Sequence, residues 1–241
     1  MISQNDIKAI FFDLDGTLRH SVPSGGEVFT DYVKTMGLQV NEEARRSALR
    51  WEHFYWASSE DLRNDLLAHS PETENFWIEY SRRRLIALGA SEEWAVEVAP
   101  KISVHMGEVY KPESVVPEDV RRTLPQLKES GYILAVISNR DQPFHELLQD
   151  HGIAEFFDFS MAAGEVNVWK PDPGIFQHGL KRANVSASEV IYVGDNYYAD
   201  VVGARNAGLQ PVLYDPLGIF PNSDCTTIQS FDELNSIVKV I

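Results

Sequence analysis

The chain has 241 residues, of which 44% are hydrophobic and 24% are charged. This is typical of a globular protein with one core domain carrying an insertion, or with two small domains. There are 21 Lys and Arg against 36 Asp and Glu, so the formal net charge is −15 with His neutral. Such a surface repels nucleic-acid backbones and anionic membranes, so we expect neither as a partner. An anionic substrate would need a locally positive pocket, supplied by a metal or a well-placed Lys.

The cysteine content and the amino terminus indicate the compartment. Cys225 is the single cysteine, which excludes an internal disulfide and a multi-cysteine zinc site and fits a reducing compartment. Residues 1–6 are polar, with no basic region before an apolar one. No apolar run reaches the ~18 residues that a membrane span needs. We expect a cytoplasmic protein that is a monomer or a homodimer.

Short apolar runs alternate with helical patterns through much of the chain. The runs are typical of strands buried on both faces, and they lie at residues 7–12, 132–137, 190–193 and 211–214, with a further short strand predicted at 156–159. The helical patterns lie at 118–130, 143–151, 173–183 and 198–207. This alternation predicts a parallel α/β sheet with right-handed crossovers.

The interval between the first two strands is too long for one crossover and lacks strand-like runs. From residue 27 to about 108 it has the pattern of successive amphipathic helices, including 42–56, 72–88 and 92–106. Breaker-rich stretches at 23–26 and 111–117 bracket it and suit a pair of hinges. We therefore expect an all-helical domain inserted into the α/β core after its first strand.

Two carboxylates follow the first predicted strand. Asp13 and Asp15 point the same way if the chain there is extended, so they can converge on one site. Two close carboxylates call for a cation between them, and hard oxygen ligands favour magnesium. Gly16 and Thr17 allow a sharp turn with backbone N–H groups free to meet an anion. The alternative is an acidic turn that merely closes a strand, and these residues alone favour neither interpretation.

Three further positions lie near carboxyl ends of predicted strands, where open α/β sheets bind ligands. Ser138 and Asn139 place a hydroxyl and backbone amides at a helix entrance, which suits phosphate, although either residue could simply cap the helix. Lys170 lies on a loop before the predicted N-cap Asp172, where a lone Lys is more often solvated. Asp195 follows the strand at 190–193, and we interpret it as either a helix cap or a metal ligand. Together and in this order, these positions indicate one site.

The motifs resemble those of the haloacid dehalogenase superfamily, whose members carry an Asp-x-Asp-Gly-Thr loop, a Ser or Thr, a Lys, and a Gly-Asp pair with a further acid downstream. The matching segments are Asp13-Leu14-Asp15-Gly16-Thr17, Ser138, Lys170-Pro171-Asp172-Pro173 and Gly194-Asp195-Asn196-Tyr197-Tyr198-Ala199-Asp200. A helical insertion directly after the first motif is similar to that superfamily's first type of cap. The resemblance implies a Rossmann-like α/β core of residues 1–18 and 115–241, with an all-helical cap domain at 19–114.

By this resemblance, Asp13 is the nucleophile that forms an aspartyl-phosphate, and Asp15 protonates the departing alkoxide before taking a proton from water. Magnesium would be held by Asp13, the backbone carbonyl of Asp15 and Asp195. Asp200 and Asn196 would orient the waters around the metal. The groups expected to bind the phosphate are Thr17, Ser138, the N–H of Asn139 and Lys170, and the Lys also offsets charge on the nucleophile.

Asp15 also indicates the reaction class. The dehalogenase branch has a different residue there, because halide needs no protonation, and the phosphonate-cleaving branch lacks the second acid and uses a cap Lys. The resemblance thus implies a magnesium-dependent phosphatase acting on a small phosphorylated metabolite. A phosphotransferase such as a sugar-phosphate mutase shares every core residue and stays open. A non-catalytic binding protein with this fold is the less favoured alternative.

The insertion is expected to select the substrate. Arg19 and His20 follow the nucleophile loop and either face the pocket or lie on a hinge surface. The aromatic cluster at residues 51–56 forms a substrate lid or, as we favour, the core of the cap. The run 82–84 is three Arg residues, which point in different directions on a helix, so we expect a mostly solvated face.

Overall fold

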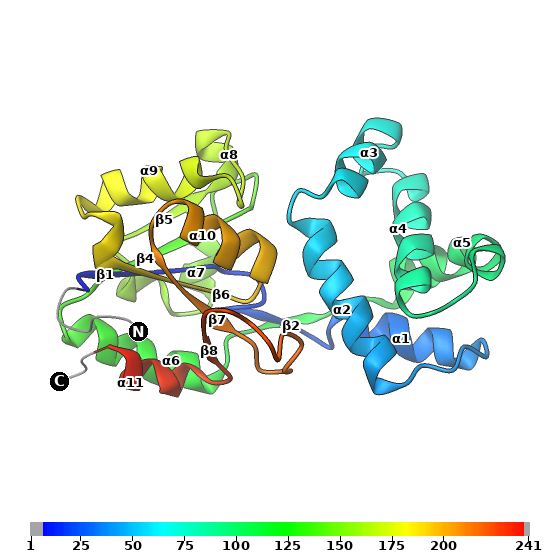
Figure 1. The fold of residues 1–241 in the computed structure, drawn as a ribbon, viewed down its shortest axis with the longest axis horizontal. Coiled ribbons are helices and arrows are strands. Elements are labelled where there is room, and N and C mark those ends of the chain that lie inside the picture. Colours follow the sequence, from blue (N-terminus) through cyan, green and yellow to red (C-terminus); the bar gives the residue numbers. More distant parts are fainter. Residues whose placement is uncertain (1–6, 239–241) are drawn as a thin grey trace. The chain divides into compact units, whose positions relative to one another are not determined.

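The computed structural model describes residues 7–238 (Figure 1). Their contacts divide them into two units, one of residues 7–20 and 115–238 and the other of residues 21–114. The core unit contains β1 (Ala9–Phe12), α6 (Glu118–Glu129), β4 (Ile133–Ser138), α7 (His145–Asp150), η1 (Ala154–Phe156), β5 (Phe159–Ala162), α8 (Ala163–Val166), α9 (Pro173–Ala183), η2 (Ala187–Glu189), β6 (Val190–Gly194), η3 (Tyr197–Val201), α10 (Val202–Asn206), β7 (Gln210–Tyr214), β8 (Thr226–Ile228), η4 (Phe231–Glu233) and α11 (Leu234–Ile237).

The core unit is a six-stranded parallel sheet in the order β5-β4-β1-β6-β7-β8. The central strands β1, β4 and β6 are buried on both faces, as their nearly continuous apolar runs predict, whereas two of the three residues of the edge strand β8 are exposed. On β1, Ile10 and Phe12 pack into one hydrophobic cluster, and Ala9 and Phe11 pack into another on the opposite face. Residues of α6, α7 and α11 belong to the first cluster, and residues of α9 and α10 belong to the second. The predicted Rossmann-like α/β core is therefore confirmed.

The register of the central strands brings the site residues to one edge. Phe12, the last residue of β1, pairs with Val136 of β4 and Val193 of β6. The chain therefore leaves three adjacent strands at nearly the same level, through Asp13, Ser138 and the residues after Gly194. Because all three strands are parallel, these departures lie at the carboxyl edge of the sheet.

The helical unit contains α1 (Gly25–Thr35), α2 (Glu42–Trp56), α3 (Glu60–Ala68), α4 (Glu74–Ala87) and α5 (Glu92–Val109). The predicted helix at 42–56 is confirmed with the same bounds, and those at 72–88 and 92–106 are confirmed with shifted ends. The unit has a hydrophobic core built from α1, α2, α4 and α5 and a smaller aromatic cluster around Tyr55 and Tyr80. Within residues 7–238, no helix has the length and apolar character to cross a membrane.

Several expected elements differ. The strand predicted at 156–159 is shifted, because the chain first makes the η1 turn and enters the sheet only at Phe159 as β5. Of the segments expected as hinges, residues 113–115 form strand β3 (Glu113–Val115), which pairs with β2 (His20–Val22). The helix predicted at 198–207 begins as a π-helical turn, η3, and becomes α-helical only at Val202.

Two expectations for the helical unit need correction. Arg84 is only 2% exposed, and Arg82 and Arg83 form ion pairs with carboxylates at about one-fifth side-chain exposure, so residues 82–84 are not a solvated face. The aromatic cluster at 51–56 is divided between two environments. Tyr55 is fully buried, whereas Phe54 and Trp56 are 46% and 38% exposed.

Candidate active site

Asp13 and Lys170 form the centre of the site. Asp13 directly follows β1 and is buried, and the Lys170 ammonium donates to its Oδ1 at 2.6 Å. The loop carrying Lys170 is fixed by the side chain of Asn139. The Asn139 Nδ2 donates to the Lys170 carbonyl at 2.9 Å, and its Oδ1 accepts the Lys170 N–H at 2.6 Å. The side chain of Asn139 thus holds the Lys170 loop against the end of β4, a contact that the sequence did not predict.

Lys170 is not solvated, as an isolated loop lysine would be. Its side chain is 3% exposed, and the ammonium also donates to Asp200 Oδ1 at 2.6 Å and to the Tyr192 hydroxyl at 3.0 Å. Tyr192 in turn donates to the Ile137 carbonyl at 2.8 Å. Tyr192 had no role predicted from the sequence. The available signal was a hydroxyl in an otherwise apolar buried strand, since such a hydroxyl needs a polar partner.

The buried charges shift one another's pKa values. Although burial opposes its charge, the carboxylates of Asp13 and Asp200 raise the pKa of Lys170 well above its ordinary value, so it stays protonated. Burial raises the pKa of Asp13 to about 7, despite the opposing effect of Lys170. Burial and then the neighbouring Asp13 raise the pKa of Asp195 well above its ordinary value. The single positive charge of Lys170 therefore does not offset the cost of burying the negative charges of Asp13 and Asp195.

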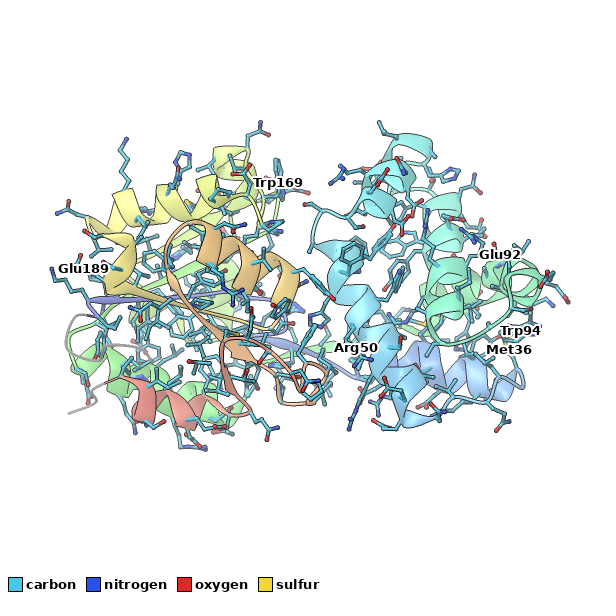
Figure 2. The ribbon with its side chains drawn as sticks, in the orientation of Figure 1. Met36, Arg50, Glu92, Trp94, Trp169 and Glu189 are labelled. Carbon is cyan, nitrogen blue, oxygen red and sulfur yellow. The ribbon has the colours of Figure 1, made fainter. Side chains whose placement is uncertain are left out.

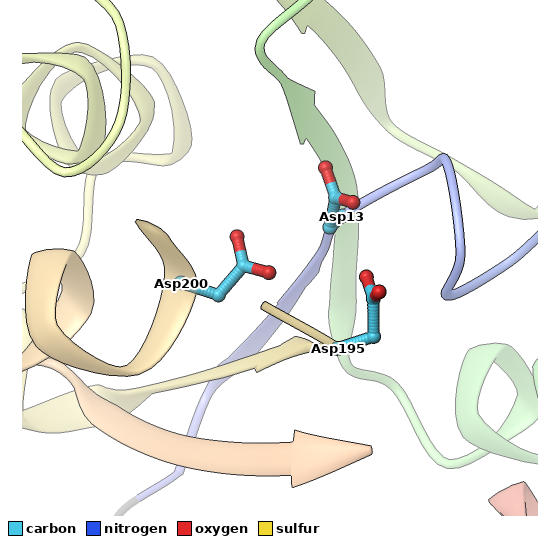
Figure 3. Close-up of side chains that lie close together, drawn as sticks. All are labelled: Asp13, Asp195 and Asp200. Carbon is cyan, nitrogen blue, oxygen red and sulfur yellow. The ribbon is translucent and has the colours of Figure 1, made fainter. Parts of the chain in front are cut away.

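Asp13, Asp195 and Asp200 form a group of possible metal ligands (Figure 3). Each offers a carboxylate oxygen, and these three oxygens lie within 4.8 Å of one another. Three carboxylate oxygens, on two buried residues and one partly buried residue, suit a hard divalent cation such as Mg²⁺. A cation there would favour the charged forms of Asp13 and Asp195, whose pKa values are raised by burial first and by neighbouring carboxylates second. The side chain of Asp15 is not a member of this group.

Two local features position the acidic group. The Thr17 hydroxyl donates to Asp195 Oδ1 and accepts the Asp195 N–H, both at 3.0 Å, so it holds the carboxylate in place. The π-helical turn η3 carries Asp200, whose Oδ2 accepts the Asn196 N–H at 2.9 Å. The Asn196 side chain caps the same turn. The wider π turn is a local departure from the α-helix, of a kind frequent at functional sites.

Asp15 lies outside the acidic group and is paired with two arginines. Arg140 donates to both of its carboxylate oxygens, from Nε at 2.7 Å and from Nη2 at 2.9 Å. Arg19 approaches Oδ1 at 3.1 Å. Of the two positions considered for Arg19, the structure thus supports the one facing the site. Arg140 was part of the motif after β4 but was given no role.

Other expectations about the loops need correction. The backbone N–H groups of Gly16 and Thr17 are not free for an anion, because the turn closes on itself and they donate to the carbonyls of Arg19 and Leu14. The Thr17 hydroxyl is likewise occupied by Asp195, which does not support direct substrate binding by this side chain. Ser138 is not at a helix entrance either, since α7 begins only at His145.

Ser138 and Asn139 nevertheless remain available at the carboxyl edge of the sheet. Ser138 is 3% exposed and ends β4. Within the described chain, its hydroxyl and the backbone N–H of Asn139 have no hydrogen-bond partner. Both donors are therefore free for a ligand beside Asp13 and Lys170.

Comparisons with known proteins agree with this geometry. The sequence model of the haloacid dehalogenase-like hydrolase family matches residues 7–208, so the chain belongs to that family. The human haloacid dehalogenase-like hydrolase domain-containing protein 3 is 29% identical over 218 residues, which cover 88% of this chain and 84% of the relative. A phosphoserine phosphatase of Thermus thermophilus is 30% identical over 233 residues, covering 87% and 89%.

A solved structure of another protein shares this fold. The crystal structure of a 2-haloacid dehalogenase from Pseudomonas syringae is 26% identical to this chain, with a TM-score of 0.55, and the match covers 96% of this chain and 97% of the other. The family therefore includes relatives named for two chemistries, and the residues of the site must decide between them.

Proposed function

We propose that the chain is a magnesium-dependent phosphatase that hydrolyses a small phosphorylated metabolite through an aspartyl-phosphate on Asp13. The observation that carries this proposal is the buried Asp13, held by Lys170 at 2.6 Å and lying in one carboxylate group with Asp195 and Asp200. Such an arrangement supplies a nucleophile together with positive charge for an anionic substrate. It also explains how a chain with a net charge of −15 can bind a phosphate ester.

In the first step, a carboxylate oxygen of Asp13 attacks phosphorus, and the bond from phosphorus to the leaving-group oxygen breaks. Lys170 holds Oδ1 of Asp13, which leaves Oδ2 for the attack. In the second step, water attacks the aspartyl-phosphate and releases inorganic phosphate and free Asp13. The pair of steps replaces one slow hydrolysis by two faster displacements.

Two donors of the chain would hold the phosphate oxygens, the Ser138 hydroxyl and the Asn139 N–H, which have no partner within residues 7–238. The Lys170 ammonium would bind the phosphate through its positive charge, because its three N–H groups already donate to Asp13, Asp200 and Tyr192. They converge because β1 and β4 are adjacent and because Asn139 also fixes the Lys170 loop. Preorganised donors of this kind stabilise charge that develops in the transition state.

Asp15 would protonate the leaving alkoxide in the first step and accept a proton from water in the second. While Arg140 donates to both of its oxygens, Asp15 cannot act as the acid. The ion pair must therefore open when substrate binds. The guanidinium is close enough to Asp15 to move onto an anionic substrate, and this exchange would couple substrate binding to the release of the acid.

Magnesium would be held by Asp13, Asp195 and the backbone carbonyl of Asp15, with Asp200 and Asn196 next to it. When bound, the ion would supply positive charge that offsets the repulsion between Asp13 and the phosphate. Thr17 supports this role indirectly, because its two hydrogen bonds set the position of Asp195.

The proposal is tested with p-nitrophenyl phosphate and a panel of phosphorylated metabolites, with and without Mg²⁺. We expect magnesium-dependent phosphate release by the native chain and its loss in Asp13→Asn. Asp224→Asn is the matched control, since this exposed carboxylate pairs with Arg205 on the surface. Equal inactivity of the native chain and Asp13→Asn on every ester would refute the proposal.

A second comparison isolates the role of Asp15. Asp15→Asn should lose more activity on an alkyl phosphate, whose alkoxide needs a proton, than on p-nitrophenyl phosphate, whose phenolate leaves unaided. Equal loss on both substrates would contradict acid catalysis by Asp15.

A further inference from the structure

The helical unit contains a cavity of its own, distinct from the site at the sheet edge. It has a volume of about 780 Å³ and is lined only by residues of α1, α2, α4, α5 and the segment directly after α5. This volume is in the range of pockets that hold small organic molecules. Much of the wall is apolar or aromatic, and this part consists of Phe29, Trp56, Trp77, Tyr80, Val104 and Met106.

A buried guanidinium lies in the wall of this cavity. Arg84 is 2% exposed, and its Nη1 donates to Glu52 Oε1 at 2.6 Å and to the Tyr80 hydroxyl at 2.9 Å. Its guanidinium also lies over the ring of Phe29, 5.0 Å from the centroid. Among the described residues, neither Nε nor Nη2 has a hydrogen-bond partner, and Nε is buried. A buried N–H donor without an acceptor is unfavourable, so an acceptor from a ligand would be favoured here.

The same guanidinium lies against the first turn of α1. A Cβ placed on Gly26 would come within 2.8 Å of Arg84 Nη2. The Ser24 hydroxyl caps α1 by accepting the Glu27 N–H, which leaves the N–H groups of Gly25 and Gly26 without an acceptor in the described chain. Free N–H groups at the N-terminus of a helix attract anions. Two independent features, the helix end and the buried Arg84, therefore favour an anion at one end of the cavity.

We propose that this cavity binds a small organic carboxylate. The carboxylate group would accept hydrogen bonds from Arg84 and from the N–H group of Gly25, both of which line the cavity. Its apolar or aromatic body would pack against the aromatic wall that contains Trp56 and Trp77. Planar guanidinium groups bind carboxylates through two parallel hydrogen bonds, which matches the pair of unpartnered nitrogens.

The acidic residues of the cavity restrict the ligand further. Glu52 neutralises Arg84 through Nη1, and Glu74 and Glu108 are exposed members of the lining. The carboxylate would therefore be held by the unpartnered N–H groups and not by net positive charge, and a ligand with a single anionic group is favoured over one with negative charge at both ends. We assign the carboxylate to a small molecule that the helical unit binds by itself, since every lining residue belongs to that unit.

The test uses 4-phenylbutanoate as the probe and its neutral amide as the comparison. The chain has five Trp residues, so an ¹⁵N spectrum of the indole groups reports binding at identified positions. We expect 4-phenylbutanoate to shift the signals of Trp56 and Trp77. Trp94 and Trp169, which are labelled in Figure 2 and are not part of the lining, should not shift.

Arg84→Met should weaken binding of the carboxylate about tenfold or more, and should leave binding of the amide nearly unchanged. Arg82→Met is the matched control on the same helix, because Arg82 pairs with Glu79 and Glu92 outside the cavity. If Arg84→Met does not fold, Ser103→Leu fills the cavity from α5 without removing the ion pair and should also abolish binding.

Absence of shifts at Trp56 and Trp77, or equal binding of the carboxylate and the amide, would overturn the proposal. The binding assay needs no catalysis, so its outcome is independent of the proposed phosphatase activity.

Discussion

Replacing Lys170 by Met removes the ammonium that joins the carboxylates of the site. Lys170 is 2% exposed and donates to Asp13 and Asp200 at 2.6 Å each. Met keeps most of the side-chain volume, so the substitution removes charge rather than packing. The two buried carboxylates would then be left without a cation, and the structure would have to accept their repulsion or protonate one of them.

Removing one partner of a buried ion pair costs about 3–5 kcal/mol, because it leaves an uncompensated charge. For a chain of this size, 1 kcal/mol shifts Tm by roughly 2–4 °C, so Lys170→Met should lower Tm by roughly 6–20 °C. The loss should be smaller below about pH 6, since Asp13, with its pKa raised to about 7, is then protonated and carries no charge. Adding Mg²⁺ should restore part of the loss by supplying positive charge to the same carboxylates.

Thermal unfolding followed by circular dichroism measures this effect. Lys128→Met is the control, because Lys128 pairs with Asp158 at 2.8 Å on the surface, where such pairs contribute about 0–1 kcal/mol. If Lys170→Met melts within about 2 °C of Lys128→Met near pH 8 without magnesium, the site is not organised by this ammonium.

Three further outcomes follow from single contacts. Tyr192→Phe removes the hydroxyl that accepts from Lys170 and should cost about 1–2 kcal/mol in urea unfolding, and an unchanged midpoint would contradict this contact. Gly16 has a φ of +88°, and Gly16→Ala would place a Cβ 2.5 Å from Asp195 Oδ2. The substitution should therefore displace Asp195 and weaken Mg²⁺ binding, measured by calorimetry, about tenfold or more. An unchanged Mg²⁺ affinity would show that this turn does not set the position of Asp195. Burial holds the pKa of His20 in the folded chain below its ordinary 6.5. Above pH 6.5 the imidazole is neutral in both the folded and the unfolded chain, and the stability of the fold is fully present. This stability is lost as the pH falls through the lower pKa of the folded chain, because the unfolded chain binds the proton first. His20→Gln should therefore reduce the loss of Tm between about pH 7.5 and about pH 5.5, and an identical loss in both proteins would exclude His20 as a source.

The core fold was predictable because its signals are local. The strands of the sheet are continuous apolar runs, and a run such as 190–193 has few alternatives to a doubly buried strand. The misplaced strand at 156–159 shows the limit of this reasoning. Phe156 and Phe157 pack against the core from outside the sheet, and apolar character alone does not distinguish such packing from strand pairing.

Chain order predicted that Asp13, Ser138 and Asp195 lie at the carboxyl ends of neighbouring strands, and the structure places them there. The catalytic roles of these residues and of Lys170 stay a prediction. What the sequence did not predict are contacts between distant segments. The two hydrogen bonds from Arg140 to Asp15 join residues 125 positions apart, and no local pattern encodes them. The burial of Arg84 likewise depends on how helices of the second unit pack, whereas helical periodicity alone assigned it to a solvated face.

The most direct test of the account is to detect the covalent intermediate on Asp13. The native chain is mixed with a phosphoester that it hydrolyses and Mg²⁺, quenched in acid during turnover, and digested for mass spectrometry. The account predicts one added phosphoryl group on the peptide that contains Asp13, absent in Asp13→Asn and absent when Mg²⁺ is removed. Steady hydrolysis without phosphorylation of that peptide, or phosphorylation at another residue, would contradict it.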